Sequence, residues 1–276
     1  MKSLAVLLTC HNRKNKTVAC LRSLYACIIP EGYLFEVFLV DDGSIDGTNE
    51  AVREQFPLIN IIQGDGTLFW NRGMNRAWSE AAKKDVDYYL WLNDDIVLYD
   101  NALTELLASS VETNDQKILV GSTCAEDNKE LITYGGRSMT VGLLKPTDEL
   151  QHCDYFNGNV VLIPRFVFQK VGMNDPLFHH ALGDFDYGLR ASKCGVSSVV
   201  VPGVLGECDE HKDLAAWCNP KTTLRKRFKL LYTALGNHPI EFFRFDKRHN
   251  GIKQACFHFI TIHLRVFCPW IWVKYK

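Results

Sequence analysis

The sequence predicts an α/β fold with a mostly parallel central sheet that is flanked by helices. Through its first hundred residues, short and almost continuously apolar stretches alternate with stretches of helical spacing, as in repeated βαβ units. The chain has 276 residues, of which 47% are apolar and 23% charged, enough for one large globular core. Polar loops follow the apolar stretches, which is the pattern of a ligand-binding edge in a doubly wound sheet.

The first half of the chain contains four expected strands and three expected helices. The strands are expected where nearly all side chains are apolar, at residues 4–9, 34–40, 58–62 and 86–92. The helices are expected where apolar residues recur every three to four positions, at residues 17–28, 49–56 and 72–84. Together these elements predict the parallel part of the sheet.

The second half is less regular. Further strands are expected at residues 117–123, 159–164 and 196–202, and helices at residues 165–172 and 184–195, with Gly172 and Gly195 at their ends. From Lys221 onward the chain becomes basic and helical. We therefore predict a main domain of residues 1–219 and a C-terminal helical extension of residues 220–276.

Charge and cysteine content narrow the class of protein. The formal net charge of −1 provides no overall field for nucleic acid, so no nucleic-acid partner is expected. Ten cysteines are scattered without a C-x-x-C pair, and the apolar run at residues 4–8 is too short for a secretory signal. We expect a cytoplasmic protein with reduced thiols.

The C-terminal segment has several candidate roles. Residues 252–272 are apolar and aromatic, but Lys253 and Arg265 interrupt them, so a membrane-spanning helix is not expected. Their composition suits an element lying on the inner face of the cell membrane. A helix that covers the core or pairs two subunits in a homodimer remains an alternative.

Four polar loops follow the first four strands and are expected to converge at one edge of the sheet. They read "TCHNR" (9–13), "DDGS" (41–44), "GDGTLFWNRG" (64–73) and "NDD" (93–95). Adjacent carboxylates such as Asp94 and Asp95 repel each other unless a cation is near, and oxygen ligands suit Mg²⁺ or Mn²⁺. Because the chain contains no P-loop and no GxGxxG motif, such an ion would take their place at a diphosphate.

Other acidic motifs suggest different chemistry. An EF-hand loop starting at Asp42 would have Arg53 where the bidentate Glu is needed, so that site is not expected, and a plain turn remains an alternative. Cys208 and His211 lack two further zinc ligands at a matched spacing. Asp184 and Asp186 stand near an expected helix start, where one can cap the helix and the other act as a general base.

Taken together, these motifs resemble family 2 glycosyltransferases with the GT-A fold. Five stretches occur in the order and spacing of that family over residues 3–212: "VLLTCHNR", "LVDDGSIDGT", "GTLFWNRGMNRA", "LWLNDD" and "FNGNVVLIPRFVFQKVGMNDPLFHHALGDFDYGLR". The resemblance is strongest to bacterial enzymes that build capsule, O-antigen or similar surface glycans. It implies a UDP-, dTDP- or GDP-linked sugar donor, a glycan or lipid-linked acceptor, and Mn²⁺ or Mg²⁺ as cofactor.

The resemblance also implies site residues. Donor-binding residues would be Thr9, Asn12, Arg13, Asp41, Asp42, Arg72, Asn75, Asn93 and Asp94. Asp95 and His211 would bind the metal, and Asp184 would be the catalytic base of an inverting, single-displacement reaction. Asn157, Gly158 and Asp186 would line the acceptor or sugar pocket.

The sequence departs from the family pattern at Cys10, Arg72, Asn93 and Gly183. Cys10 stands where many members have Thr, and Arg72 replaces a common small residue and could add a cation beside the diphosphate. Gly183 replaces the Glu that precedes the base, so the role of that carboxylate is lost or passes to Asp186. Asn93 replaces the first Asp of the DxD motif, so the metal would have one carboxylate fewer.

Two other functions remain open from the sequence alone. A sugar-nucleotide pyrophosphorylase shares the sheet, but it needs a glycine-rich basic loop after the first strand, where this chain has "TCHNRKNK". A non-catalytic nucleotide-sugar-binding protein of the same fold is the third possibility, and Gly183 is the reason to consider it.

Overall fold

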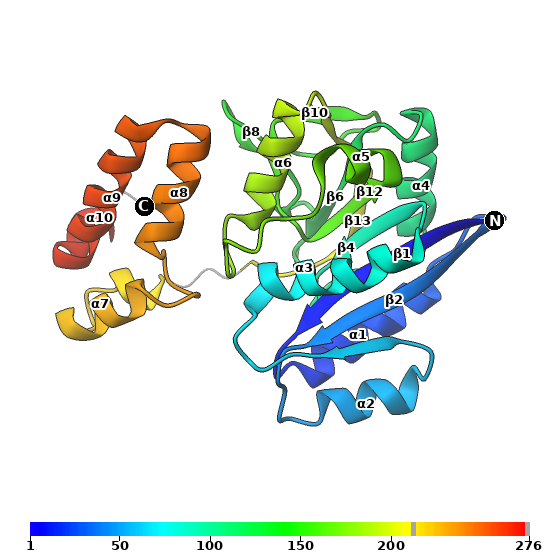
Figure 1. Ribbon diagram of the computed structural model, residues 1–276, viewed down its shortest axis with the longest axis horizontal. Helices are drawn as coiled ribbons and strands as arrows, with labels where there is room; N and C mark the ends of the chain where they lie inside the picture. Colours follow the sequence, from blue (N-terminus) through cyan, green and yellow to red (C-terminus); the bar gives the residue numbers. More distant parts are fainter. Residues whose placement is uncertain (211–213, 274–276) are drawn as a thin grey trace. The chain divides into compact units, whose positions relative to one another are not determined.

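The chain forms two compact units, seen in the computed structural model of Figure 1. The structure describes residues 1–210 and 214–273. Unit 1 consists of Met1–Asp175 and Asp184–Glu210, and unit 2 of Pro176–Gly183 and His211–Lys276. The predicted division into a main domain of residues 1–219 and a C-terminal extension of residues 220–276, which would contact an acceptor, a membrane or a second subunit, stays a prediction.

A mixed sheet forms the centre of unit 1, with its strands in the order β10-β13-β6-β12-β4-β1-β2-β3. Along this path β10 and β12 run antiparallel to their neighbours, and the other pairs are parallel. The short strands β5 (Val97–Leu98) and β7 (Ile132–Tyr134) pair with β13 and β6. The bounds of the main strands are β1 Lys2–Cys10, β2 Tyr33–Asp41, β3 Asn60–Gln63, β4 Tyr88–Leu92, β6 Ile118–Cys124, β10 Gln151–Cys153, β12 Val160–Pro164 and β13 Ser198–Glu207.

Helices cover both faces of this sheet. Successive side chains of a strand point to opposite faces, and the central strands are apolar at nearly every position, so both faces must be buried. In β1, Leu4, Val6 and Leu8 pack with the helices α1 and α4, whereas Ala5 and Leu7 pack on the other face with α3. The helical elements of unit 1 are α1 Lys14–Ala26, α2 Thr48–Gln55, α3 Phe69–Ala81, the 3₁₀ turn η1 Ala82–Lys84, α4 Ala102–Glu112, α5 Arg165–Val171 and α6 Gly183–Lys193.

The reversed direction of β12 places its start at the carboxyl end of β4. Val160 pairs with Leu92 in the antiparallel register, and the Asn93 N–H donates to the carbonyl of Asn159 at 3.0 Å. The loop before β12 therefore lies beside the "NDD" loop after β4.

The predicted fold class is confirmed, and two features of unit 1 were not predicted. Helix α4 follows β5 directly, and its apolar face, which includes Leu103 and Leu106, is buried. A separate three-stranded sheet is formed by β8 (Gly136–Ser138), β9 (Gly142–Leu143) and β11 (Tyr155–Phe156). Strands of two or three residues are too short to show a periodicity in sequence.

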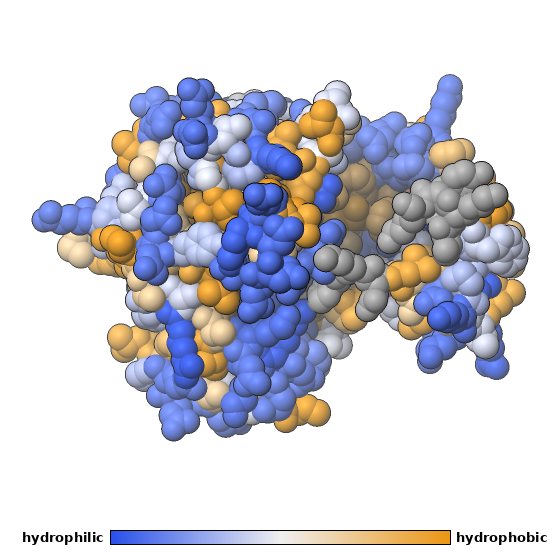
Figure 2. All heavy atoms as spheres, turned by 180° about the vertical axis from the view of Figure 1, so that it is seen from behind, coloured by the Kyte–Doolittle hydropathy of each residue, from blue (hydrophilic) through white to orange (hydrophobic). Residues whose placement is uncertain are grey.

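Unit 2 is helical and has its own small core. Trp217, Leu231, Ile262 and Val266 are buried together. Its elements are the 3₁₀ turn η2 Ala216–Cys218, α7 Leu224–Leu231, α8 Pro239–His249, α9 Ile252–Phe267 and α10 Pro269–Val273. Within the described residues, none of the helices is both long and apolar enough to cross a membrane. Figure 2 shows hydrophobic residues exposed between hydrophilic ones on the face it presents.

Trp78 of α3 is a sensitive test of the packing in unit 1, because its buried ring contacts four aromatic rings. The ring centroids of Tyr89, Trp91, Phe168 and Tyr187 lie 5.3–5.6 Å from that of Trp78. The Trp78→Ala substitution should lower the free energy of unfolding by about 3–5 kcal/mol, measured by urea unfolding with far-UV circular dichroism. The matched control Val111→Ala, on an exposed position of α4, should change it by less than about 0.5 kcal/mol. Equal stability of the two variants would contradict this account of the core.

Candidate active site

The adjacent carboxylates Asp94 and Asp95 lie just after β4 and face two cations, Arg13 from the loop after β1 and Lys16 from the first turn of α1. The Arg13 Nη1 donates to Asp94 Oδ1 at 3.1 Å and to Asp95 Oδ2 at 2.9 Å. Lys16 Nζ lies 3.9 Å from Asp95 Oδ2. Because β1 and β4 are parallel neighbours, their carboxyl ends meet, and this brings Arg13 to the acidic pair. Arg13 and Lys16 thus supply positive charge close to the two carboxylates, which reduces the repulsion between them.

Asp94 is the more buried member of the pair. Its Oδ2 accepts a hydrogen bond from the Thr17 hydroxyl at 3.1 Å, and its side chain is 7% exposed. Burial raises the pKa of Asp94 to about 6, although Arg13 acts in the opposite direction. Asp94 therefore holds α1 and the end of β4 together.

Asp95 is the less buried member of the pair, and its predicted role as a metal ligand stays a prediction. Its side chain keeps 11% of its surface exposed, and its Oδ1 lies 3.7 Å from Cys208 Sγ, which donates to it. His211, the second predicted metal ligand, lies outside the described residues. No group of three or more possible ligands gathers within the described ranges. One carboxylate suits Mg²⁺ or Mn²⁺ when substrate phosphates supply further oxygen ligands.

Trp70, at the first turn of α3, fixes the orientation of the Asn93 amide. The indole Nε1 donates to Asn93 Oδ1 at 2.6 Å. Because an indole N–H can only donate, the amide oxygen faces Trp70 and the amide nitrogen lies on the opposite side of the group. Asn93 therefore offers N–H donors, whereas the Asp of a DxD motif would offer only acceptors.

Asp184 stands at the start of α6, where two backbone N–H groups hold its carboxylate. Gly158 donates to Oδ2 and Phe185 donates to Oδ1, each at 2.9 Å. Burial raises the pKa of Asp184 to about 6, and the N–H bonds together with the nearby Arg137 act against this rise. A carboxylate with such a pKa can accept a proton near neutral pH.

Gly158 and Trp70 connect this carboxylate to the loop after β4. A Cβ on Gly158 would come within 2.5 Å of the Trp70 ring and 3.1 Å of Asp184 Cβ, so only glycine fits there without movement. Trp70 thus contacts Asn93 through its indole nitrogen and packs on Gly158 through its six-membered ring. Asn93, Gly158 and Asp184 thus lie close together around Trp70, a connecting residue that the sequence reasoning missed, and their roles in a site stay a prediction.

Arg137 of β8 is a second residue that was missed. Its Nε donates to Asn157 Oδ1 at 3.0 Å, and its charge lowers the pKa of Asp184 relative to burial alone. Arg137 belongs to the irregular region without a sequence motif, whereas Trp70 lies inside the quoted "GTLFWNRG" loop and could have been singled out.

Asp41 and Asp42 are buried, and their carboxylates are engaged by nearby loops. Asp41 accepts the Ser44 N–H at 3.0 Å and the Asn49 side-chain amide at 3.2 Å. Asp42 accepts three backbone N–H groups at 2.8–3.0 Å, from Gly66, Leu68 and Phe69. The bonds of Asp42 hold the loop that leads into α3 and Trp70, and contacts of Asp41 and Asp42 to a nucleobase or ribose stay a prediction.

The other predicted donor-binding residues also make contacts that shape the loops. The Asn12 side-chain oxygen accepts the Ile45 N–H at 2.8 Å, and the Asn75 amide donates to the Asn174 carbonyl at 2.7 Å. Thr9 is buried against α3, and Arg72 is half-buried in the first turn of that helix. Thr9 lies near the end of β1, Asn12 in the loop after it, and Arg72 and Asn75 in the first two turns of α3.

Asp186 faces the interior of unit 1. Its carboxylate is 0% exposed and accepts from Arg190 Nε at 2.8 Å, one turn along α6. Arg190 also donates to the carbonyls of Val171 and Met173. This ion pair favours a structural role for Asp186. The predicted place of Asp186 in an acceptor or sugar pocket stays a prediction.

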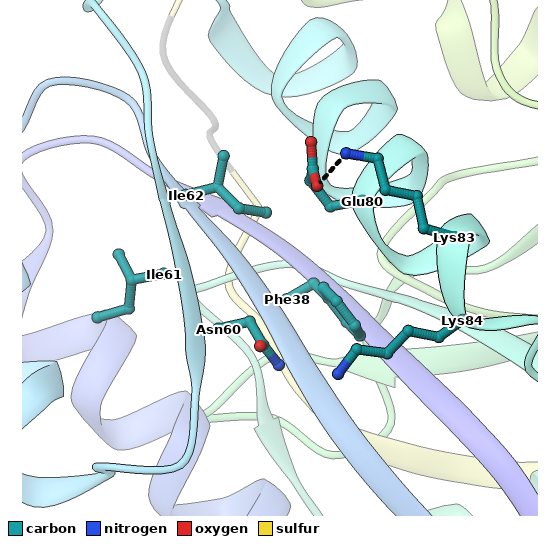
Figure 3. Close-up of a pocket in the computed structure, with 7 residues that line it drawn as sticks. All are labelled: Phe38, Asn60, Ile61, Ile62, Glu80, Lys83 and Lys84. Atoms are coloured by element: carbon teal, nitrogen blue, oxygen red, sulfur yellow. Dashed lines mark hydrogen bonds and ion pairs between the residues drawn. The ribbon is translucent and has the colours of Figure 1, made fainter.

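A pocket of about 350 Å³ lies away from these residues, beside the edge strand β3. Figure 3 shows that Lys83 is paired with Glu80 and that Lys84 points toward Asn60 and Phe38. None of the predicted site residues lines this pocket, so we do not place the active site there.

Comparison with known proteins identifies the family. The model of "Glycosyl transferase family 2" matches residues 5–172, more than half of the chain. The chain therefore belongs to glycosyl transferase family 2 and is a glycosyltransferase. The predicted enzyme class is confirmed, and the pyrophosphorylase and non-catalytic alternatives are set aside.

Individual relatives are distant. An N-acetylglucosaminyl-diphospho-decaprenol L-rhamnosyltransferase from Mycobacterium tuberculosis is 21% identical over 248 residues, covering 79% of this chain and 77% of the relative. A Pyrobaculum calidifontis mannosyltransferase, PcManGT, solved with GDP-Man and Mn²⁺, is 15% identical with a TM-score of 0.59, covering 97% of this chain and 73% of that one. S. aureus TarS 1–349 with UDP-GlcNAc is 14% identical with a TM-score of 0.58, covering 95% and 72%. These structures support the GT-A fold.

The bridge from Arg13 to the acidic pair can be tested by a double-mutant cycle. The Arg13→Met substitution should cost about 1–3 kcal/mol of unfolding free energy, because Asp94 and Asp95 are left without their nearest cation. Adding Asp95→Asn should recover part of this loss, with a coupling energy of about 0.5–3 kcal/mol in urea unfolding. Lys16→Met, which removes a more distant and exposed cation, should cost less than about 0.5 kcal/mol. Strictly additive effects of Arg13→Met and Asp95→Asn would refute the bridge.

Proposed function

We propose that this chain transfers a sugar from a nucleotide-diphosphate donor to a hydroxyl of a lipid-linked glycan acceptor, with inversion at the anomeric carbon and with a divalent cation. The observation that carries the proposal is the joining of Asp184 to the acidic loop after β4 through Gly158 and Trp70. A general base and a diphosphate-binding loop within one site are what a single displacement requires.

Asp184 is proposed as the base. Its carboxylate takes the proton of the acceptor hydroxyl while that oxygen forms a bond to the anomeric carbon, and the bond from this carbon to the diphosphate oxygen breaks. Each carboxylate oxygen is held by one backbone N–H, which fixes its direction and leaves further acceptor capacity on both oxygens. Attack from the face opposite to the leaving group inverts the sugar configuration.

The diphosphate is proposed to lie at the loop after β4. Mn²⁺ or Mg²⁺ would be held by Asp95 and would neutralise the charge that develops on the leaving diphosphate. A metal role for His211 stays a prediction. The guanidinium of Arg13 adds positive charge at the same place, and the Asn93 amide nitrogen, directed by Trp70, offers N–H groups to a phosphate or ribose oxygen. Asn93 is thereby proposed as a hydrogen-bond donor to the ligand.

The acceptor class is proposed from the mycobacterial relative, whose name specifies a diphospho-decaprenol acceptor. By this analogy the chain would act in the synthesis of a surface polysaccharide such as capsule or O-antigen, at the cytoplasmic face of the membrane. The donor remains a choice among UDP-, dTDP- and GDP-linked sugars, because the solved relatives contain both UDP-GlcNAc and GDP-Man. Thermal shift with each donor class in the presence of Mn²⁺ identifies the nucleotide.

The role of Asp184 predicts a pH dependence. Because its pKa is raised to about 6, the carboxylate is protonated below this pH, and kcat/KM should rise as the pH increases through about 6. The Asp184→Asn variant should lose about 10²–10⁴-fold in kcat and lose this rising limb. Asp94→Asn should keep the limb, although the pKa of Asp94 is also raised to about 6. A limb that survives in Asp184→Asn but vanishes in Asp94→Asn would exclude Asp184 as the base.

The role of Asp95 predicts a metal dependence. Chelation by EDTA should stop release of the nucleoside diphosphate from the donor, and added Mn²⁺ should restore it. Asp95→Asn should weaken the apparent Mn²⁺ affinity by at least about tenfold in a titration of the rate. The exposed carboxylate Asp127 provides a matched Asp→Asn control that should titrate like the wild type. Full activity in EDTA would contradict the proposed metal dependence and would show that Arg13 and Lys16 alone can neutralise the diphosphate.

A further inference from the structure

The two units carry opposite charge. Unit 1 contains 18 Lys and Arg against 29 Asp and Glu, whereas unit 2 contains 13 Lys and Arg against 3 Asp and Glu. The net charge of −1 for the whole chain conceals this asymmetry. Unit 2 is therefore a basic module attached to an acidic one.

The acidic side chains in the described part of unit 2 are used internally. Glu241 accepts from the His179 backbone N–H at 3.2 Å, and its other oxygen lies 2.5 Å from His179 Nδ1. Asp246 Oδ2 lies 2.8 Å from His258 Nδ1, and Asn250 donates to Oδ1 at 2.8 Å. Both carboxylates are buried, so every exposed charged side chain in the described part of unit 2 is basic: Lys221, Arg225, Lys226, Lys229, Arg244, Lys247, Arg248 and Lys253.

Helix α9 is apolar on two sides. One side, with Ala255, Ile262 and Val266, is buried in the core of unit 2. The other side carries an exposed stripe at i, i+3, i+7 and i+10, formed by Phe257, Ile260, Leu264 and Phe267, each between 50% and 59% exposed. Trp270 and Ile271 of α10 add 60% and 44% exposed apolar surface beyond its end. A helix that is apolar on both sides is expected to be covered on both.

A helix of another protein chain and a lipid bilayer both suit such a stripe, and the charge decides between them. A second copy that used the same surface would bring two basic surfaces together, which is unfavourable. The acidic unit 1 of a second copy offers no matching stripe, because none of its described helices exposes more than one large apolar side chain. An anionic bilayer supplies both an apolar interior for the stripe and negative charge for the surrounding Lys and Arg residues.

We propose that unit 2 docks on an anionic phospholipid bilayer, with the Phe257, Ile260, Leu264 and Phe267 stripe of α9 inserted among the acyl chains and the basic residues of α7 and α8 at the headgroups. Phe228 of α7 packs edge-on against Phe267, with ring centroids 5.1 Å apart, so the basic residues beside Phe228 lie close to the stripe. Lys247 and Arg248 lie in the last turn of α8, and Lys253 lies in the first turn of α9. This docking does not depend on the proposed reaction.

Vesicle co-sedimentation of the full chain, without donor or acceptor, tests the proposal. The protein should sediment with phosphatidylcholine vesicles that contain phosphatidylglycerol at least about tenfold more strongly than with pure phosphatidylcholine vesicles. High salt should weaken this binding, because part of it is electrostatic. Absence of binding to the anionic vesicles at low salt would overturn the proposal.

Two variants separate the apolar and the basic contributions. Phe257→Ser with Leu264→Ser should weaken binding to anionic vesicles by about tenfold or more, since exposed apolar side chains no longer enter the bilayer. Arg225→Gln with Lys226→Gln and Lys229→Gln should weaken it and flatten its salt dependence. Val111→Ser with Phe166→Ser, two exposed apolar residues on helices of unit 1, is the matched control and should bind like the wild type. Equal binding of the stripe variant and this control would also overturn the proposal.

Two further measurements test whether the stripe variant is folded and whether the stripe pairs two subunits. Far-UV circular dichroism and slow hydrolysis of a water-soluble nucleotide-sugar should be unchanged in the stripe variant, as expected of a folded protein. Sedimentation velocity without vesicles tests for a second copy. A wild-type dimer that the stripe variant converts to a monomer, together with no vesicle binding, would assign the stripe to subunit pairing and refute docking on lipid.

Discussion

The site depends on the antiparallel pairing of β12 with β4. In a sheet of parallel strands only, the residues before a strand lie at the opposite edge from the residues after its neighbour. The reversal of β12 brings the residues on either side of Gly158 to the end of β4, where Asn93 donates to the Asn159 carbonyl. From that position the Gly158 N–H reaches Asp184, and its lack of a side chain admits the Trp70 ring. The proposed base, Asp184, and the acidic loop after β4 lie close together because β12 runs antiparallel to β4.

The carboxylates of the candidate site are each stabilised by nearby side chains and backbone N–H groups, and the net charge of the whole chain plays no part in this. Asp94 and Asp95 are adjacent, and Arg13 bridges them from the neighbouring strand end. Asp184 is held by two backbone N–H groups and lies near Arg137, but burial still raises its pKa to about 6. Arg13 thus supplies positive charge to the carboxylate pair, in which burial still raises the pKa of Asp94 to about 6, whereas Asp184 is held directly by backbone N–H groups. We propose that the first environment binds the diphosphate and that the second deprotonates the acceptor hydroxyl.

The two units meet in the sequence directly before the proposed base. Pro176–Gly183 belongs to unit 2, where Phe178 is buried and His179 contacts Glu241, and Asp184 follows it as the first residue of the second part of unit 1. The basic, apolar unit and the proposed catalytic carboxylate are therefore adjacent along the chain. Docking of unit 2 at a bilayer would keep a lipid-linked acceptor at the same surface as the enzyme, which connects the docking proposal to the proposed acceptor.

The sequence by itself determined the fold class, the order of strands and helices in the first hundred residues, and which loops are acidic. Buried parallel strands appear in a sequence as short apolar runs, and the loops at their ends appear as polar stretches. It did not reveal α4 as a separate helix or the small sheet that carries Arg137, since strands of two or three residues have no period to detect. Only the tertiary structure decided that Asp186 is paired with Arg190 in the interior, that Trp70 orients the Asn93 amide, and that Arg13 lies between two carboxylates. These are contacts between residues far apart in the chain, or choices between two faces of one helix, and they depend on strand register and burial.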